Sequence, residues 1–227
     1  MKVGFIAYDA NHLKSDQVLN HWYASAPSEV VQNSKIFLVP FKPRRSREIV
    51  FAHRPDQKLG GHPRDIARYM GVAVEYCEST AEIPSGMDIY IVLGVGLLPD
   101  EFVENNCVIN AHPGIIPYSR GLDSFKWAIY NHRKVGVTLH RLSPEVDMGA
   151  VWIKRETPIL RSDTLESFAR RHYELEIGLL SRFDMFLGKE PQPVDPREAV
   201  SATRRMPTDK EQKLWDAFEG YKRQYAK

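Results

Sequence analysis

The sequence from residue 107 to residue 117 reads Cys-Val-Ile-Asn-Ala-His-Pro-Gly-Ile-Ile-Pro. An apolar run at its start ends in Asn110, His112 and Pro113, which are polar or turn-forming residues. A short apolar run bounded by such residues is typical of a buried strand in an α/β sheet. The stretch therefore predicts a strand whose carboxyl end carries two candidate functional side chains, Asn110 and His112.

Similar apolar runs lie before this stretch, separated by longer amphipathic segments. They predict buried strands at residues 3–8, 36–41, 72–76 and 88–93. Alternation of strands with helical segments indicates an α/β fold whose sheet is largely parallel at its start and flanked by helices. The sequence thus favours a Rossmann-like architecture.

Helical spacing appears in two of the connecting segments. Residues 63–71 place Ile66, Tyr69 and Met70 on one predicted face and end at Gly71, as a crossover helix should. Residues 124–132 form the second predicted helix, with an apolar face of Phe125, Ala128 and Ile129. Two further strands, at 136–141 and 151–157, would form an antiparallel pair around the loop that carries Asp147.

The last third of the sequence predicts a long helix and a short appendage. Asp163 with Glu166 three residues later offers a capping pattern for a helix that would run to about Leu187. Closely spaced prolines follow from Pro191, so we expect a catalytic domain at 1–190. Residues 191–227 would form a linker, a short strand near 202–205 and a final helix, which is too little for an independent domain.

Composition narrows the classes of protein. Lys and Arg number 31 and Asp and Glu 29, and the resulting net charge of +2 gives no reason to expect nucleic acid or a membrane as partner. The two cysteines, Cys77 and Cys107, lack metal-ligand spacing, which argues against a disulfide scaffold or a metal site. No stretch has the length of a membrane span or a signal peptide, so we expect a soluble, cytoplasmic protein.

Asn110, His112 and the later Asp147 form the most informative set of side chains. An amide donor, an imidazole and a carboxylate are the parts needed to stabilise a developing oxyanion, so the set indicates acyl transfer. The alternative is local, because Asn, Pro and Asp are also common turn residues. Of the other histidines, His140 is expected to be structural, and His62, His132 and His172 are expected at the surface.

The linked motifs resemble the core signature of the folate-dependent formyltransferases. Residues 107–117 carry the resemblance together with Arg120-Gly121, Gly136–His140 and Val146–Gly149. It implies a Rossmann-like formyltransferase fold and 10-formyltetrahydrofolate as co-substrate, with no metal. By the same resemblance Asn110 would hold the formyl oxygen, and His112 would be its electrophilic partner and a candidate general acid. Asp147 would favour the charged imidazole and help to relay a proton.

The resemblance also indicates where the pterin ring would bind. Gly94 and Gly96 would let the ligand approach the backbone closely, and a second wall would follow the strand at 136–141. A Gly-x-Gly dinucleotide turn is the competing interpretation, but the third glycine is missing. The expected cofactor-binding residues are Leu93, Gly94, Val95, Gly96, Leu97, Leu98, Leu142, Ser143, Pro144, Glu145 and Val146.

The acceptor side departs from one branch of the family. Phosphoribosylglycinamide formyltransferases carry a glycine-rich phosphate loop after the first strand, whereas residues 7–13 here contain no glycine. A basic loop at residues 42–47 could instead grip a diphosphate. The expected acceptor contacts are Asp9, Asn11, Arg44, Arg45 and Arg47.

These features favour the amino-sugar branch. The expected reaction is formyl transfer from 10-formyltetrahydrofolate to a primary amine, with a nucleotide-linked 4-amino-4,6-dideoxy sugar of surface-polysaccharide synthesis as acceptor. Phosphoribosylglycinamide formyltransferase and formyltetrahydrofolate hydrolase remain alternatives among enzymes, although the hydrolases usually carry an additional amino-terminal domain. A folate-binding scaffold without turnover is the alternative outside enzymes, and the oligomeric state stays open, a homodimer included.

Overall fold

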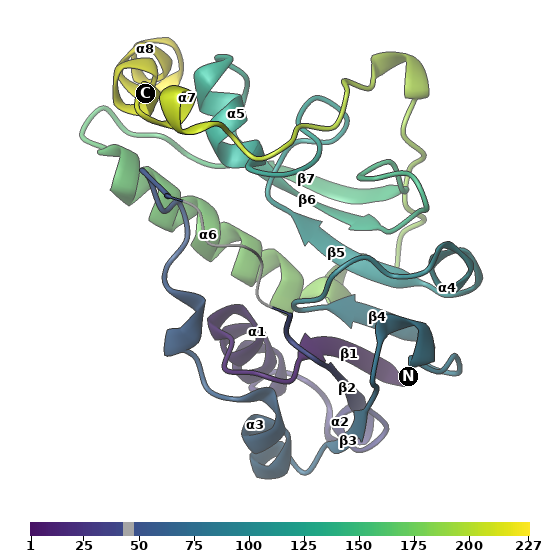
Figure 1. Cartoon of the computed structure of the whole chain (residues 1–227). Coiled ribbons are helices and arrows are strands. Elements are labelled where there is room, and N and C mark those ends of the chain that lie inside the picture. Colours follow the sequence, from purple (N-terminus) through teal and green to yellow (C-terminus); the bar gives the residue numbers. More distant parts are fainter. Residues whose placement is uncertain (43–47) are drawn as a thin grey trace.

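The computed structural model describes residues 1–42 and 48–227, which fold around one seven-stranded sheet with the strand order β3-β2-β1-β4-β5-β6-β7 (Figure 1). The strands in chain order are β1 (Val3–Tyr8), β2 (Lys35–Val39), β3 (Ala73–Tyr76), β4 (Ile89–Val92), β5 (Val108–His112), β6 (Gly136–Arg141) and β7 (Val151–Glu156). Strands β1 to β5 pair in parallel, whereas β6 and β7 are antiparallel to their neighbours. The predicted mostly parallel α/β sheet is confirmed.

Helices cover both faces of this sheet. They are α1 (Leu13–Tyr23), α2 (Ser28–Gln32), α3 (Pro63–Met70), α4 (Asp100–Asn105), α5 (Ser124–Tyr130), α6 (Leu165–Ser181), α7 (Thr208–Glu211) and α8 (Leu214–Tyr225). In β1, Phe5 and Ala7 pack with α1, α3 and α6, while Ile6 faces the opposite way into a cluster with Phe102 and Val103 of α4. This alternation explains why β1 is apolar at almost every position, because both of its faces are buried.

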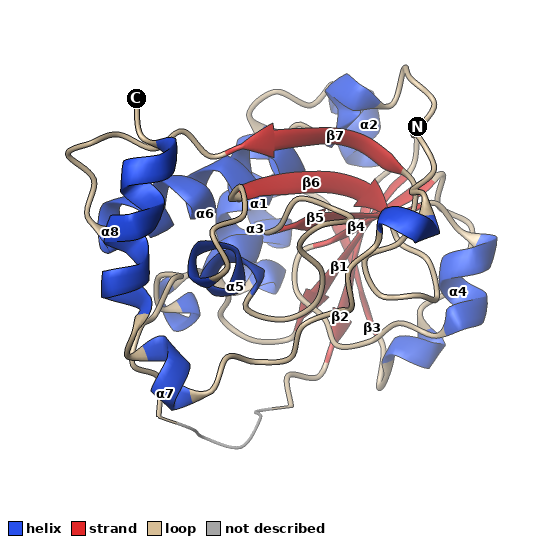
Figure 2. Cartoon of the chain, turned by 90° about the horizontal axis from the view of Figure 1, so that it is seen from above, coloured by secondary structure: helices blue, strands red, loops and turns tan. Residues whose placement is uncertain are grey.

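A third cluster of buried side chains joins α5, α8 and the start of α6. Phe125, Phe168, Phe218 and Tyr221 meet there, and Figure 2 shows α5 and α8 side by side at one end of the molecule. Helix α8 therefore packs onto α5 and α6. The division into a domain at 1–190 and an appendage stays a prediction.

The carboxyl-terminal segment lacks one predicted element. The strand expected near residues 202–205 is wrong, since Thr203 forms only a single bridge, to Gly121. The sequence there is too irregular to continue a ladder, and both bridge partners sit in loops. The predicted final helix is confirmed as α8.

The long helix begins and ends differently from the prediction. Thr164 is its N-cap residue and forms a capping box with Ser167, whereas Asp163 accepts hydrogen bonds from Arg171. The helix ends at Ser181 and is followed by a 3-10 turn at Phe183–Phe186 instead of continuing to Leu187. The cap thus lies one residue later than the carboxylate pattern suggested.

Two side-chain positions were predicted wrongly. In α3 the buried face is Pro63, Ala67 and Met70, and Tyr69 is 79% exposed because it lies about 100° around the helix from Met70. His172 was expected at the surface but is 2% exposed, because it follows Phe168 by one helical turn on the buried face of α6. Gly71 ends α3 with a φ of 69°, as predicted for its C-cap.

The helices in the described part of the chain include none that combines the length and apolar character needed to cross a membrane.

Candidate active site

Strand β5 presents Asn110 and His112 on the same side of the sheet. Side chains alternate along a strand, so these two residues point away from α6, while Ile109 and Ala111, on either side of Asn110, join the core on the α6 side. Across the antiparallel ladder, Asn110 pairs with His140 and His112 with Thr138 of β6. The two candidate catalytic residues therefore share one face with His140.

His112 and Asp147 form a buried contact at this face. Nδ1 of His112 lies 3.3 Å from Oδ1 of Asp147, and the side chains are 4% and 10% exposed. On the other side of the ring, Nε2 lies 2.9 Å from the carbonyl oxygen of Ser119 and 3.2 Å from Oγ of Ser124. A carboxylate and a carbonyl both accept hydrogen bonds, so this arrangement fits an imidazolium that donates from both nitrogens.

The β6–β7 connection holds Asp147 in an uncommon backbone conformation. Its φ is 51°, in the left-handed region that Asp adopts more readily than most residues. Its second oxygen, Oδ2, accepts a hydrogen bond of 2.7 Å from the backbone N–H of Gly121. The carboxylate is thus fixed at one oxygen and presents the other to His112.

His140 completes the surroundings of Asp147. Its Nε2 lies 3.9 Å from Oδ1 of Asp147, and its ring meets that of His112 edge-on at 6.2 Å. Burial lowers the pKa of His140 to about 4, and Nδ1 lies 3.0 Å from the carbonyl oxygen of Arg141. A neutral ring that donates from Nδ1 fits this environment. His140 therefore lies against both His112 and Asp147 as an uncharged polar neighbour.

The side chain of Asn110 differs from those of the two other candidate residues in its hydrogen bonding. Within residues 1–42 and 48–227 its side-chain amide makes no hydrogen bond, and the residue is partly exposed. Its N–H donors are therefore available to a ligand.

The segment predicted as the first cofactor wall follows β4. Leu93 is buried, Gly94, Val95 and Leu98 are partly exposed, and Leu97 is 86% exposed. A Cβ added at Gly94 would lie 2.6 Å from Cε1 of His12, so this glycine already makes room for a protein side chain. At Gly96 an added Cβ would meet nothing within 4 Å.

The second predicted wall adjoins Asp147 directly. Leu142 and Ser143 are partly exposed, and Pro144, Glu145 and Val146 are exposed. Glu145 and Val146 line a pocket of about 490 Å³ on the side of the carboxyl-terminal segment. The remaining residues that line it are Arg120, Met148, Pro196, Ala199, Val200, Ser201 and Ala202.

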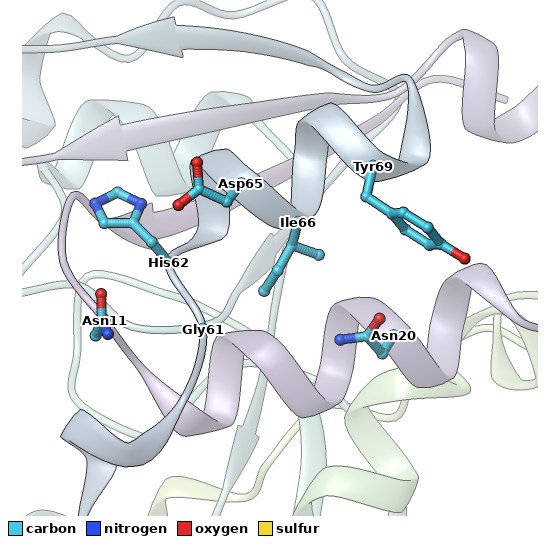
Figure 3. A pocket seen from close by; sticks show the side chains of 7 residues that line it. All are labelled: Asn11, Asn20, Gly61, His62, Asp65, Ile66 and Tyr69. Atoms are coloured by element: carbon cyan, nitrogen blue, oxygen red, sulfur yellow. The ribbon is translucent and has the colours of Figure 1, made fainter.

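Of the residues predicted to contact the acceptor, Asp9 and Asn11 lie near the same pocket. Asn11 lines a pocket of about 440 Å³ between α1 and α3 (Figure 3), and the carboxylate of Asp9 lies 3.3 Å from Nε2 of His62, which lines the same pocket. The other lining residues are Asn20, Gly61, Asp65, Ile66 and Tyr69. His62, expected at the surface without a partner, is half-buried. Arg44, Arg45 and Arg47 lie outside the described residues.

A buried ionic group near α1 escaped the sequence analysis. Glu176 of α6 is 1% exposed in its side chain and pairs with Lys14 at 2.8 Å and with Arg54 at 2.7 Å. Burial alone would raise the pKa of Glu176, but the charges of Arg54 and Lys14 outweigh it and lower that pKa to about 2. Glu176 lies one helical turn after His172 on the buried face of α6. This spacing is the sequence feature that could have indicated a buried carboxylate.

In the parts of the chain that the structure describes, no group of three or more His, Cys, Asp or Glu side chains has the arrangement of a metal site.

The part of the chain that carries the candidate site is similar in sequence to known formyltransferases. Residues 84–183 match the family model described as formyl transferase. The dTDP-4-amino-4,6-dideoxyglucose formyltransferase of Mycobacterium bovis is 31% identical over 133 residues, which cover 57% of this chain and 53% of that protein. The phosphoribosylglycinamide formyltransferase of Dictyostelium discoideum is 33% identical over 107 residues, or 40% of this chain and 51% of that protein.

A solved structure shares the fold over most of the chain. The formyltransferase PseJ from Anoxybacillus kamchatkensis, in complex with UDP-4,6-dideoxy-4-formamido-L-AltNAc and tetrahydrofolate, superposes with a TM-score of 0.53 at 22% identity. The alignment covers 81% of this chain and 94% of that one. The matched part of the sequence spans about half of the length of the curated relatives. The segment that carries Asn110, His112 and Asp147 lies within the residues that match the formyl transferase family model.

Proposed function

We propose that this protein transfers a formyl group from 10-formyltetrahydrofolate to the amino group of a nucleotide-linked 4-amino-4,6-dideoxy sugar. The observation that carries the proposal is the contact between His112 and Asp147, 3.3 Å apart, beside the unpartnered amide of Asn110. An amide, an imidazole and a carboxylate can together stabilise the oxyanion of formyl transfer, and all three lie in the segment that matches the family model.

The residues would act on charge that develops during the reaction. Attack by an amine on a formyl carbon places negative charge on the formyl oxygen in the transition state. The amide of Asn110 would donate a hydrogen bond to that oxygen, and the cationic ring of His112 would stabilise it electrostatically. Each such donor is worth roughly 10²- to 10³-fold in rate.

Asp147 would keep the ring of His112 charged and oriented. Its Oδ1 faces Nδ1 while Gly121 holds Oδ2, so the carboxylate cannot turn away without losing a hydrogen bond. In the proposed reaction the carboxylate would receive a proton from the attacking amine through a water molecule. We therefore assign Asp147 the roles of orienting group and proton relay.

The residues around the pair suit a reduced folate as formyl donor. The bound folate would supply the activated formyl group, and Leu93–Leu98 together with Leu142–Val146 would hold its pterin ring. The open space at Gly96 and the partly exposed apolar side chains beside it fit a flat, partly apolar ring. The PseJ structure, which contains tetrahydrofolate, supports the same donor.

The acceptor class rests on a different set of observations. The loop after β1 has no glycine and ends at His12, the N-cap of α1, so it is not the glycine-rich loop that cradles a phosphate at a helix N-terminus. The Mycobacterium relative is named for a dTDP-linked 4-amino-4,6-dideoxy sugar and PseJ is bound to a UDP-linked 4-formamido sugar. Both favour a nucleotide-linked amino sugar over glycinamide ribonucleotide.

Competition kinetics test this acceptor assignment. The protein would be given 10-formyltetrahydrofolate with equal concentrations of glycinamide ribonucleotide and a dTDP- or UDP-linked 4-amino-4,6-dideoxy sugar, and both formylated products would be measured. We expect the nucleotide sugar to be formylated with a kcat/KM at least roughly 100-fold higher, since a site built for one polar ligand discriminates strongly against another. Efficient turnover of the ribotide alone would refute the acceptor class but not the formyl chemistry.

A further inference from the structure

One loop holds both members of the His112–Asp147 pair. The carbonyl oxygen of Ser119 and Oγ of Ser124 contact Nε2 of His112, and the N–H of Gly121 donates to Oδ2 of Asp147. The relative placement of imidazole and carboxylate therefore depends on the conformation of residues 119–124, which we call the clamp loop.

The carboxyl-terminal segment is attached to the clamp loop through Thr203. The backbone N–H of Thr203 donates to the carbonyl oxygen of Arg120 at 2.9 Å, and its own carbonyl accepts from the N–H of Leu122 at 2.8 Å. Its hydroxyl lies 2.8 Å from the carbonyl oxygens of both Arg120 and Leu122 and can donate to either. Thr203 thus binds the residues on both sides of Gly121.

The contact between Thr203 and Gly121 is also sterically tight. Gly121 has a φ of 86°, and a Cβ built on it would lie 2.3 Å from the carbonyl oxygen of Thr203 and 2.6 Å from its nitrogen. Only glycine fits both the backbone conformation and the space. The backbone of the carboxyl-terminal segment therefore rests directly on the residue that donates to Asp147.

Arg120 provides a second connection between the same parts. Its guanidinium donates to the carbonyl oxygen of Val146, next to Asp147, and to the carbonyl oxygen of Val200, near Thr203. The guanidinium is 7% exposed, so these hydrogen bonds are shielded from water. Arg120 thus connects residue 200 to the loop that carries Asp147, in addition to the hydrogen bonds between Thr203 and the clamp loop.

We propose that Thr203 is a positioning residue for the His112–Asp147 pair, acting through the clamp loop. Thr203 lies outside the segment 84–183 that matches the family model, and its hydrogen bonds among the described residues go to Arg120 and Leu122. Its hydroxyl donates to the carbonyl oxygen of Arg120 or of Leu122, which flank Gly121, and so helps to keep the N–H of Gly121 aimed at Asp147. The catalytic consequence rests on the proposed function, whereas the structural link does not.

The test compares Thr203→Val, which keeps the branched shape but removes the hydroxyl, with Thr203→Ser, which keeps the hydroxyl. Thr208→Val on α7 is the matched control, because this threonine makes no side-chain hydrogen bond within the described residues. Steady-state kinetics at a temperature where all four proteins are folded would give kcat and KM for 10-formyltetrahydrofolate. Hydrogen exchange of the Gly121 amide and NMR signals of the His112 ring would be measured in the same proteins.

We expect Thr203→Val to lower kcat roughly tenfold or more with little change in KM, because a small misplacement of catalytic groups costs rate and not binding. The Gly121 amide should exchange faster and the His112 signals should shift, and Thr203→Ser should restore both. A folded Thr203→Val protein with unchanged Gly121 exchange and His112 signals would overturn the proposal. If the wild type shows no turnover while these signals do respond, the proposed function fails and the positioning role stands.

Discussion

Nδ1 of His112 lies 3.3 Å from Oδ1 of Asp147, although the two residues come from β5 and from the connection between β6 and β7. Strand β6 runs antiparallel to β5 and ends opposite Ile109, near the amino end of β5, so the β6–β7 connection starts there. Asp147 meets His112 because this connection reaches back towards the carboxyl end of β5. The fold thus brings two short motifs, separated by two elements, into one buried contact.

Substitution of either residue should reduce turnover without preventing donor binding. We expect His112→Gln and Asp147→Asn each to lower kcat by roughly 10²- to 10³-fold, because their interactions strengthen as charge develops on the formyl oxygen. Steady-state kinetics would measure kcat, and calorimetry would measure folate affinity. His21→Gln, at an exposed position on α1, is the control. A loss confined to folate affinity would contradict the assigned roles.

Gly96 offers a test of the first cofactor wall. A Cβ at this position meets no protein atom within 4 Å, so Gly96→Ala should leave the free energy of unfolding nearly unchanged. If the pterin ring approaches the backbone here, the same variant should bind tetrahydrofolate roughly tenfold or more weakly. Calorimetric titration compares the two proteins, and equal affinities would place the ring elsewhere.

Removal of the Glu176 carboxylate should destabilise the fold. Glu176→Gln would leave Lys14 and Arg54 without their buried counter-charge, and breaking a buried ion pair in this way costs about 3–5 kcal/mol. Glu174→Gln, on the exposed side of the same helix, should change the free energy of unfolding by less than about 0.5 kcal/mol. Urea unfolding at pH 7 measures both. If Glu176→Gln changed the free energy of unfolding as little as Glu174→Gln does, the ion pairs of Glu176 would contribute little to stability.

Stability should fall on mild acidification. Burial lowers the pKa of His140 and of His172 to about 4, from an ordinary value of 6.5. As the pH falls from 6.5 towards 4, the unfolded chain binds protons that the folded protein does not, so the free energy of unfolding decreases throughout this window. The contribution of Glu176, whose pKa is lowered to about 2, is lost only at lower pH, from 4.5 downwards.

His172→Gln separates this effect from general acid denaturation. The variant lacks the ionisable ring, so the decrease in its free energy of unfolding between pH 7 and pH 4.5 should be smaller than that of the wild type by roughly 1–3 kcal/mol. His21→Gln should retain the wild-type pH dependence. Parallel curves for the wild type and His172→Gln would show that His172 is not buried in its neutral form.

The sequence correctly predicted the helices and strands that are marked by the spacing of apolar residues within a short segment. Apolar runs bounded by turn residues located β1 and β6, and the spacing of Phe125, Ala128 and Ile129 located the buried face of α5. Features that depend on distant contacts were missed. His172 appeared polar and therefore exposed, but α6 crosses the sheet and buries it against Phe125 and the hydroxyl of Thr157.

The sequence predicted the residues of the candidate site but not the groups that hold them in place. Asn110, His112 and Asp147 could be chosen because their chemistry and linked motifs stand out in the sequence. The hydrogen bonds from Gly121 to Asp147 and from Thr203 to the clamp loop involve backbone groups, which every residue possesses. No side-chain pattern therefore marked them in advance.

Transfer of a labelled formyl group tests the central claim most directly. Wild-type protein would be incubated with 10-formyltetrahydrofolate labelled in its formyl carbon and a dTDP- or UDP-linked 4-amino-4,6-dideoxy sugar, alongside Asp147→Asn and a reaction without acceptor. We predict that label appears on the sugar nitrogen, with one tetrahydrofolate released for each formylated sugar, and that both products fall together in Asp147→Asn. Release of labelled formate at the same rate with and without the amine would contradict formyl transfer and indicate hydrolysis, and no release at all would indicate a protein that only binds folate.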